Sequence, residues 1–322
     1  MKTDPATIHA SVLLEAAVDG LAPQDGGRYA DVTCGLGGHT ERLLARSGPT
    51  GRVLAVDRDP RAIELARGRL ERFGDRVTVV EGDFADLPVY AGAEDMLPLD
   101  GVIADLGVSS LQLNDAQRGF SFTRDGPLDM RMGPRVGPTA AELLERFDVP
   151  DLTRILRDFG EERRAHKIAQ AIVAAREAQQ LETTGALAEV VSRALGGRKA
   201  SPIHPATRAF QAIRIAVNRE LEQLERLLEV LSDVVRPGGR VAIIAFHSLE
   251  DRLVKRAFND PPPEPYPPGI PLEPRRVLGP WRALTKKPLV PTDEEAADNP
   301  RARSAKLRIA ERRTSPAEEE AT

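Results

Sequence analysis

The sequence has little that would suit a secreted or membrane protein. Cys34 is the only cysteine among 322 residues, which excludes an intrachain disulfide and a cysteine metal cluster. The longest clean apolar run, residues 241–246, is far too short to span a bilayer. The first nine residues contain no apolar core of a signal peptide. We therefore expect a cytoplasmic protein with no membrane partner.

The chain also lacks an excess of positive charge. Its formal net charge is −4, which argues against indiscriminate binding of nucleic acid. The charge is uneven, however, because residues 301–313 contain six basic residues and one acid. Apolar residues alternate there at Ala305, Leu307 and Ile309, so this segment is predicted to be a strand with basic side chains on its other side.

The most informative segment lies near the N-terminus. Residues 29–33 read as a strand, residues 34–38 as a glycine-rich turn, and a helix is predicted from His39. Asp57 follows about 20 residues later, at the end of a second apolar run. Glycines allow the backbone to approach a nucleoside cofactor, and an acid at the next strand end accepts the ribose hydroxyls. An ordinary tight turn of an α/β protein is the plainer interpretation.

The turn favours S-adenosylmethionine over NAD. A dinucleotide fingerprint places a third glycine where this chain has Thr40. Further strands are predicted at residues 77–81 and 99–105, with helices between the strands. This alternation predicts a doubly wound parallel sheet, which binds ligands at the carboxyl ends of its strands. Asp57, Asp83 and Asp105 fall at those ends.

The alternation stops at about Leu113 and resumes after about Ala212. The intervening residues are predicted to be helical and carry 15 basic against 13 acidic side chains. Apolar residues from Phe210 to Val235 recur at spacings of three and four, which predicts one continuous apolar helix face. We therefore expect a discontinuous cofactor-binding domain, 1–112 with 213–322, and an inserted helical substrate-recognition domain, 113–212. Residues 261–300 hold 12 of the 26 prolines and are expected to form a loop within the first domain.

Several long motifs resemble one family, the ribosomal RNA small subunit methyltransferase H family, also called MraW. The resemblance extends from about His9 to Arg312. The motifs that carry it are Asp31-Val-Thr-Cys-Gly-Leu-Gly-Gly-His39, Asp105-Leu-Gly-Val-Ser-Ser-Leu-Gln112, Arg118-Gly-Phe-Ser-Phe122, Pro127-Leu-Asp-Met-Arg-Met132, Gly160-Glu-Glu-Arg163, Phe210-Gln-Ala-Ile-Arg-Ile-Ala-Val-Asn218, Phe246-His-Ser-Leu-Glu-Asp-Arg252 and Asn299-Pro-Arg-Ala-Arg-Ser-Ala-Lys-Leu-Arg308.

The resemblance implies a class I, Rossmann-like methyltransferase sheet with an inserted helical domain. It implies that S-adenosylmethionine is the methyl donor and that the substrate is the N4 amine of a P-site cytidine (cytidine 1402) in 16S rRNA of the small ribosomal subunit. It also implies that the insertion helps to bind that substrate. The cofactor contacts that it implies are Gly37, Gly38, His39, Asp57, Phe84, Asp105 and Gln112.

The chemistry requires an acceptor for the amine, because the cytosine N4 lone pair is conjugated into the ring and the amine is a poor nucleophile. Asp105 is our candidate for this catalytic role, and a cluster of His247, Ser248 and Asp251 is the alternative. No aromatic residue follows Asp105 directly, so Phe120 or Phe122 is expected to stack the target base. His39 is expected to bind or orient and not to act as a base. No metal is expected, because the five histidines are scattered.

Three other functions fit parts of the sequence. One is a methyltransferase that acts on another nucleic acid, a protein or a small molecule. Another is an NAD-dependent oxidoreductase, against which Thr40 argues. The third is a non-enzymatic RNA-binding assembly factor that uses the basic strand at 301–313. The sequence leaves open the oligomeric state, a homodimer included, and whether naked RNA or the assembled subunit is the substrate.

Overall fold

The computed structural model describes residues 11–134, 137–197, 204–262 and 277–314. The chain forms two compact units: residues 1–107 with 222–322, here the sheet unit, and residues 108–221, here the helical unit. The prediction drew these boundaries at 112/113 and 212/213. The second boundary therefore falls later than expected, inside the first turn of helix α11 (Glu220–Val234).

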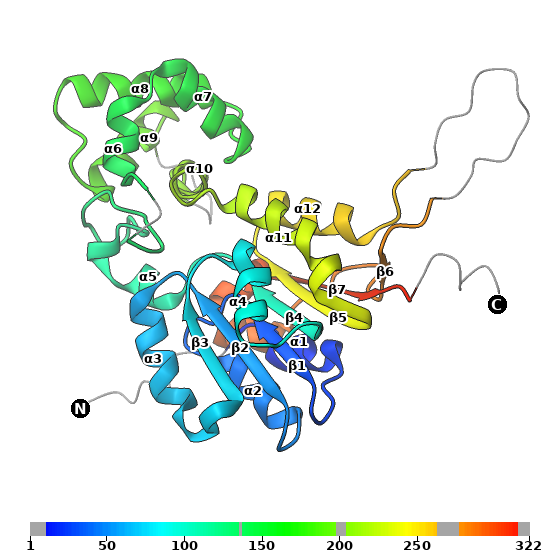
Figure 1. Cartoon of the computed structure of the whole chain (residues 1–322). Coiled ribbons are helices and arrows are strands. Elements are labelled where there is room, and N and C mark those ends of the chain that lie inside the picture. Colours follow the sequence, from blue (N-terminus) through cyan, green and yellow to red (C-terminus); the bar gives the residue numbers. More distant parts are fainter. Residues whose placement is uncertain (1–10, 135–136, 198–203, 263–276, 315–322) are drawn as a thin grey trace, which may run out of the picture. The chain divides into compact units, whose positions relative to one another are not determined.

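The sheet unit contains a seven-stranded sheet in the order β3-β2-β1-β4-β5-β7-β6 (Figure 1). Its first four strands are parallel, β5 is parallel to β4, and β7 is antiparallel to both of its neighbours. The strand order reverses between β1 and β4, and this is the switch point at which such sheets bind ligands. The strands are β1 (Arg28–Asp31), β2 (Arg52–Asp57), β3 (Val77–Glu81), β4 (Leu99–Asp105), β5 (Val235–Ala245), β6 (Trp281–Ala283) and β7 (Lys306–Arg312).

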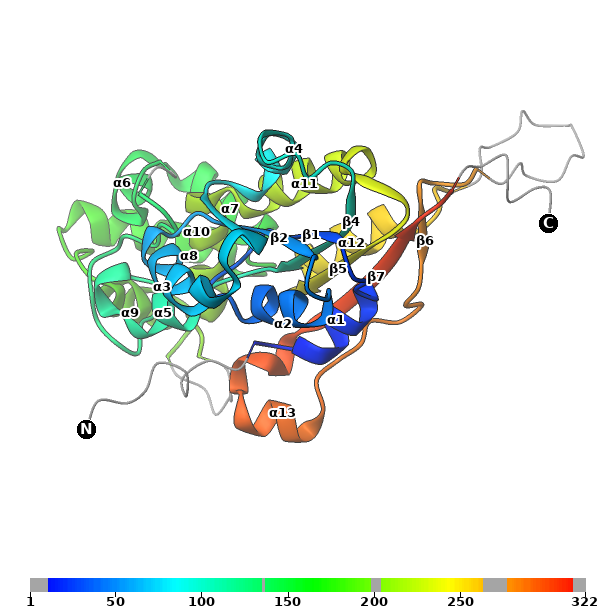
Figure 2. The same ribbon diagram turned by 60° about the horizontal axis from the view of Figure 1, so that its bottom comes forward.

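Helices cover both faces of this sheet, as the periodicity predicts (Figure 2). One apolar layer packs α4, α11 and α12 on the sheet, and the other packs α1, α2 and α3. The helices are α1 (Leu14–Leu21), α2 (Gly38–Arg46), α3 (Pro60–Leu70), α4 (Leu87–Ala93), α12 (Ser248–Phe258) and α13 (Asp293–Asp298). The 3₁₀ turns are η2 (Glu71–Arg76), η3 (Phe84–Asp86) and η5 (Pro300–Ser304).

The helical unit packs its helices around a separate apolar core. Leu128 and Met130, from the loop that precedes α6, are buried in the same core as Ile168 of α8 and Ile213 of α10. A capping box formed by Thr139 and Glu142 starts α6. The helices are α5 (Ser110–Asn114), α6 (Ala140–Arg146), α7 (Val149–Asp158), α8 (Ala165–Glu177), α9 (Thr184–Ala194) and α10 (Thr207–Asn218); the 3₁₀ turn η4 is Ala116–Arg118.

Two sequence predictions were wrong in detail. The apolar face from Phe210 to Val235 is not one helix face, because Arg219 adopts a left-handed conformation (φ 52°) that ends α10 before α11 begins. Its apolar residues therefore serve two cores, those of the helical unit and the sheet unit. Residues 261–300 are not a plain loop either, because the described part of this range contains β6 and α13.

The strand predicted in the basic segment is present as β7, and two of its basic side chains pair with an acid of α12. Arg308 is 7% exposed, and its Nε donates to Asp251 Oδ1 at 2.7 Å; Lys306 Nζ lies 3.3 Å from Asp251 Oδ2. Burial alone would raise the Asp251 pKa, but the hydrogen bond and charge of Arg308 outweigh burial and hold that pKa below its usual value. These ion pairs join β7 to α12.

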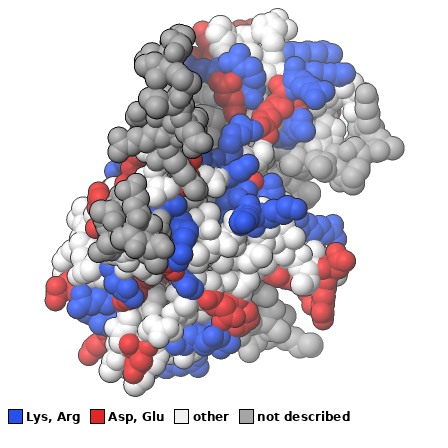
Figure 3. All heavy atoms as spheres, turned by 90° about the vertical axis from the view of Figure 1, so that its right-hand side faces the viewer, with Lys and Arg blue, Asp and Glu red and all other residues white. Residues whose placement is uncertain are grey.

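Surface charge is mixed in sign. On the face drawn in Figure 3, Lys and Arg side chains stand among Asp and Glu side chains over much of the area. Across the described ranges, no helix combines the length and the hydropathy that crossing a bilayer requires.

We expect Arg308→Met to lower the free energy of unfolding by about 2–4 kcal/mol, because it leaves the largely buried Asp251 carboxylate with Lys306 alone. Denaturant unfolding of the purified protein measures this loss. Arg193→Met is the matched control, since Arg193 pairs with Glu189 at an exposed position of α9. A loss no larger than that of the control would show that the β7–α12 ion pairs contribute little.

Candidate active site

The strand register creates a notch at the carboxyl edge of the sheet. Asp31, the last residue of β1, is opposite Ala55 and Ile103, so β2 and β4 each continue two residues further, to Asp57 and Asp105. The glycine turn fills this notch. Gly37 has φ 80° and forms the N-cap of α2 without a side-chain cap, a conformation that glycine adopts without strain.

Asp57 is fixed by the backbone on both of its oxygens. The Gly35 amide donates to Oδ2 at 2.7 Å, and the Asp59 amide donates to Oδ1 at 2.9 Å. Burial raises the pKa of Asp57, and these two hydrogen bonds act in the opposite direction. Each oxygen keeps a further lone pair, so the carboxylate can still accept hydroxyl donors.

Asp31 and Thr40 form a buried pair that the sequence analysis missed. The Thr40 hydroxyl donates to Asp31 Oδ2 at 2.6 Å, and the Thr33 amide donates to Oδ1 at 3.2 Å. Burial raises the Asp31 pKa to about 6 even though the hydrogen bonds favour its charged form. Thr40 stands where a dinucleotide fingerprint has its third glycine, and its hydroxyl serves as a hydrogen-bond donor to Asp31.

Asp105 lies beside this pair at the end of β4. Its amide donates to Thr33 Oγ1 at 2.5 Å, which replaces the strand hydrogen bond that β1 no longer offers. Its Oδ1 is buried and has no hydrogen-bond partner among the described residues, although the side chain as a whole is 23% exposed. An unpartnered buried carboxyl oxygen is costly in a folded protein, so it marks Asp105 as a group kept for a ligand.

Burial and three charged neighbours set the protonation of Asp105. Burial raises its pKa to about 8, the negative charges of Asp31 and Glu250 add to this, and Arg301 of η5 opposes it. Burial also lowers the pKa of the Arg301 guanidinium. Arg301 was missed as a site residue, because the sequence analysis assigned the Asn299-Pro-Arg motif to a basic strand.

His39, in the first turn of α2, is neutral. Its Nε2 lies 3.2 Å from the Val12 carbonyl oxygen, which only accepts, so Nε2 carries the proton. Burial lowers the His39 pKa to about 4. Its Nδ1 therefore presents a lone pair, and it lies 3.9 Å from Asp105 Oδ2.

Phe84 follows β3 at the same edge of the sheet. It begins η3, after Asp83, and is partly buried against the apolar layer of α4 and α11. The Arg58 guanidinium lies 5.8 Å from the Phe84 ring centre and forms an ion pair with Asp83 at 2.6 Å. This arrangement offers a flat apolar surface with polar groups at its rim.

Six of the seven predicted cofactor contacts thus lie in one unit, on the turn and strand ends of the carboxyl edge. They are Gly37, Gly38, His39, Asp57, Phe84 and Asp105. Gln112 belongs to the helical unit, where it is 5% exposed. Its Oε1 accepts the Ser109 amide at 3.0 Å in the capping box of α5.

Two members of the alternative catalytic cluster make structural contacts, although His247 Nε2, like Asp105 Oδ1, is buried without a hydrogen-bond partner among the described residues. Asp251 is paired with Arg308 and Lys306. His247 caps α12, since the Glu250 amide donates to its Nδ1 at 3.4 Å. The Glu250 carboxylate in turn accepts the Phe246 amide at 2.8 Å.

The candidate stacking residues are also engaged. Phe122 packs against His204 and Phe210, with ring centres 4.5 and 4.9 Å away. Phe120 is only 7% exposed. Phe122 is only partly buried by these contacts, and the stacking role of either ring stays a prediction.

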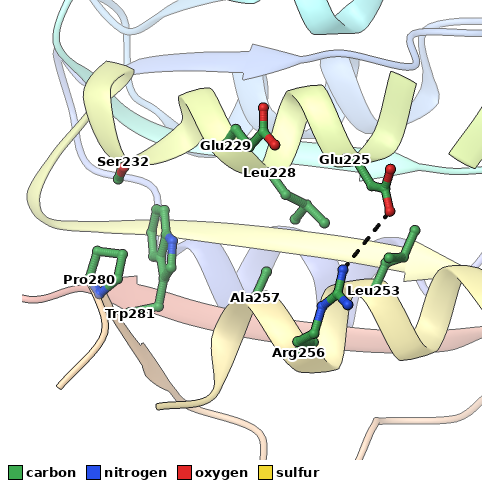
Figure 4. Close-up of a pocket in the computed structure, with 9 residues that line it drawn as sticks. All are labelled: Glu225, Leu228, Glu229, Ser232, Leu253, Arg256, Ala257, Pro280 and Trp281. Atoms are coloured by element: carbon green, nitrogen blue, oxygen red, sulfur yellow. Dashed lines mark ion pairs between the residues drawn. The ribbon is translucent and has the colours of Figure 1, made fainter. Parts of the chain in front are cut away.

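A separate cavity of about 510 Å³ lies in the sheet unit between α11, α12 and Trp281 (Figure 4). Glu225 and Arg256 form a 3.9 Å ion pair across it. No predicted site residue lines this cavity, so it is distinct from the strand-edge site.

The fold and the strand-edge site define a class of protein. An antiparallel β7 inserted beside β5, together with a glycine turn, an acid at the end of β2 and an acid at the end of β4, is the arrangement of class I S-adenosylmethionine-dependent methyltransferases.

Comparison with known proteins identifies the family. The model of the MraW methylase family matches residues 6–313, so the chain belongs to this family. Curated relatives named "Ribosomal RNA small subunit methyltransferase H" include one from Thermomicrobium roseum, 49% identical over 96% of this chain and 95% of its own length. Another, from Magnetococcus marinus, is 47% identical over 94% of this chain and 98% of its own length. The protein is a methyltransferase, and its cofactor is S-adenosylmethionine, as the sequence predicted.

The raised pKa of Asp105 predicts a stability that depends on pH. A carboxyl whose folded pKa is about 8, against an unfolded value of about 4, favours folding at low pH and loses that contribution as pH rises through 8. Asp105→Asn removes the ionisable group. The free energy of unfolding of the variant, relative to that of the wild type, should therefore increase from pH 5.5 to pH 8.5 by on the order of 2 kcal/mol.

Thermal unfolding of the cofactor-free proteins at both pH values measures this difference. Asp298→Asn, at an exposed position in the final turn of α13, is the control and should show no such trend. An Asp105→Asn variant whose advantage does not grow with pH would mean that Asp105 ionises normally in the fold.

Proposed function

We propose that the protein transfers a methyl group from S-adenosylmethionine to the exocyclic N4 amine of a cytidine in 16S rRNA, at the P site of the small ribosomal subunit. The names of the relatives support ribosomal RNA of the small subunit as substrate. The observation that carries the reaction is the buried, unpartnered Oδ1 of Asp105 at the end of β4.

The residues at the strand edge suit this cofactor. Asp57 accepts the two ribose hydroxyls, because its oxygens are already aimed by the Gly35 and Asp59 amides. Phe84 offers the apolar surface against which an adenine packs. Gly37 and Gly38 let the turn approach the ligand closely, and the absence of a third glycine fits a ligand without a pyrophosphate. When bound, S-adenosylmethionine supplies a methyl group on a positively charged sulfur.

Asp105 then acts on the amine. Its Oδ1 accepts a hydrogen bond from N4–H, which favours the pyramidal amine whose lone pair is free to attack. As the nitrogen becomes positively charged, the carboxylate stabilises that charge and afterwards takes the surplus proton. A carboxyl with a raised pKa is suited to hold that proton.

The decisive test is nucleoside mass spectrometry of 16S rRNA. Small subunits and naked 16S rRNA from cells that lack this protein are incubated with purified enzyme and S-adenosylmethionine. N4-methylcytidine at the P-site position is expected with wild type and not with Asp105→Asn. Methylation of another base, or none on either substrate, would contradict the proposal and favour another substrate or a non-enzymatic role.

Asp57→Ala should weaken S-adenosylmethionine binding at least about tenfold, because each lost charge-assisted hydrogen bond contributes roughly 1.5–3 kcal/mol. Isothermal titration calorimetry measures the affinity. Asp25→Ala, at an exposed turn of the same unit, is the control and should bind normally. Unchanged affinity of Asp57→Ala for S-adenosylmethionine would contradict the assignment of Asp57 as the acceptor of the ribose hydroxyls.

We also propose that the helical unit reads the RNA. Arg163, Arg164 and Lys167 are exposed where α8 begins, and within the described ranges Arg163 and Lys167 have no ion-pair partner. Reversing these three charges to Glu should weaken binding of the small subunit and leave cofactor affinity unchanged. Binding by the wild type should fall steeply with salt. Equal loss of both affinities would contradict a separate substrate-reading role.

A further inference from the structure

His39 has an orientation fixed by its own hydrogen bond, and the proposed function does not use it. Its Nε2–H is held by the Val12 carbonyl, and the side chain is 4% exposed. The imidazole therefore has one remaining polar atom, the Nδ1 lone pair. That atom faces Asp105 Oδ2 at 3.9 Å, which is roughly 1 Å longer than a hydrogen bond.

The two carboxyl oxygens of Asp105 lie in different environments. Oδ1 is buried without a partner, whereas Oδ2 faces a neutral acceptor. An ionised carboxylate and the Nδ1 lone pair repel each other, but a protonated carboxyl can donate to Nδ1 after a small rotation. The geometry thus distinguishes the oxygen that carries a proton from the oxygen that remains free.

We propose that His39 is a positioning residue for Asp105: in the free protein its Nδ1 accepts a hydrogen bond from the protonated Oδ2 of Asp105, which leaves Oδ1 as the oxygen that meets the target amine. This inference rests on the proposed role of Asp105. In the reaction the amine N–H bond breaks, its electron pair stays on nitrogen, and an O–H bond forms on Asp105. Asp105 must therefore have lost its resting proton before each turnover.

The surrounding charges suit this proton-holding state. Asp31 of β1 and Glu250 of α12 add negative charge, and Arg301 of η5 provides one positive charge. His39 of α2 contributes an uncharged acceptor. A positively charged ligand bound at the strand edge shifts this balance toward the carboxylate. Binding of S-adenosylmethionine should consequently release a proton near neutral pH.

Calorimetry in buffers of different ionisation enthalpy measures that release. At pH 7 we expect the wild type to release most of one proton on binding S-adenosylmethionine and clearly less on binding its uncharged-sulfur product, S-adenosylhomocysteine. Asp105→Asn should release none through this route. Equal proton release with both ligands, or release that persists in Asp105→Asn, would overturn the proposal.

Two substitutions separate the two hydrogen bonds of His39. A Gln amide nitrogen reaches the place of Nε2 and can still donate to Val12, but it leaves no acceptor at Nδ1. An Asn amide reaches the place of Nδ1 and can accept from Asp105, but it does not reach Val12. We expect His39→Gln to lower the pH at which proton release is half-complete by about one unit, and His39→Asn to stay close to wild type.

In the opposite pattern, His39→Gln keeps the wild-type pH midpoint of proton release and His39→Asn loses it. That pattern would show that His39 acts only through Val12. Should neither variant fold, nitrogen NMR of the wild-type imidazole decides the matter. The Nε2–H tautomer is expected from pH 6 to 8, and an Nδ1–H tautomer or an imidazolium would overturn the proposal. These outcomes are independent of the RNA substrate, so failure of rRNA methylation would leave them interpretable.

Discussion

The early end of β1 is the constraint on which the rest of the site depends. Because β1 stops at Asp31 while β2 and β4 continue two residues further, the sheet edge has a notch between Asp57 and Asp105. Backbone groups that would face β1 need other partners there. Thr33 accepts the Asp105 amide, and the Gly35 amide turns to Asp57. The hydrogen bonds that satisfy these backbone groups therefore also fix Asp57 and Asp105 in place.

The notch places several acids in a low-dielectric region with little positive charge. The negative charges of Asp31 and Glu250 act on Asp105, and among the described residues the charge of Arg301 opposes them. Such an arrangement costs stability, because a buried carboxyl is forced toward its neutral form. An enzyme tolerates that cost where a ligand later supplies the missing charge or donor. Asp251, by contrast, is paired with two cations, and these ion pairs join β7 to α12.

Much of the sheet unit followed from sequence, because strand and helix periodicities are local. The bounds of β2, β3 and β4 agree with prediction. The break between α10 and α11 at Arg219 could not be predicted, because a left-handed residue leaves the apolar spacing of three and four unchanged. The electrostatic interaction between Arg301 and Asp105 links segments nearly 200 residues apart, and no local pattern encodes it. Whether Phe120 or Phe122 is packed or open is likewise decided by tertiary contacts.

The distribution of basic residues bears on where RNA would be read. The densest basic segment in the sequence, residues 301–313, is the one that a non-enzymatic RNA-binding function would use. Yet Arg308 and Lys306 neutralise Asp251, and the Arg313 guanidinium pairs with Asp260 at 2.8 Å. A guanidinium already bound to a carboxylate gains little from a phosphate, because the second contact must displace the first. Unpaired cations attract phosphate at no such cost. As far as the described residues show, Arg163 and Lys167 on the helical unit are of this kind, whereas the basic segment of β7 mainly holds the sheet unit together.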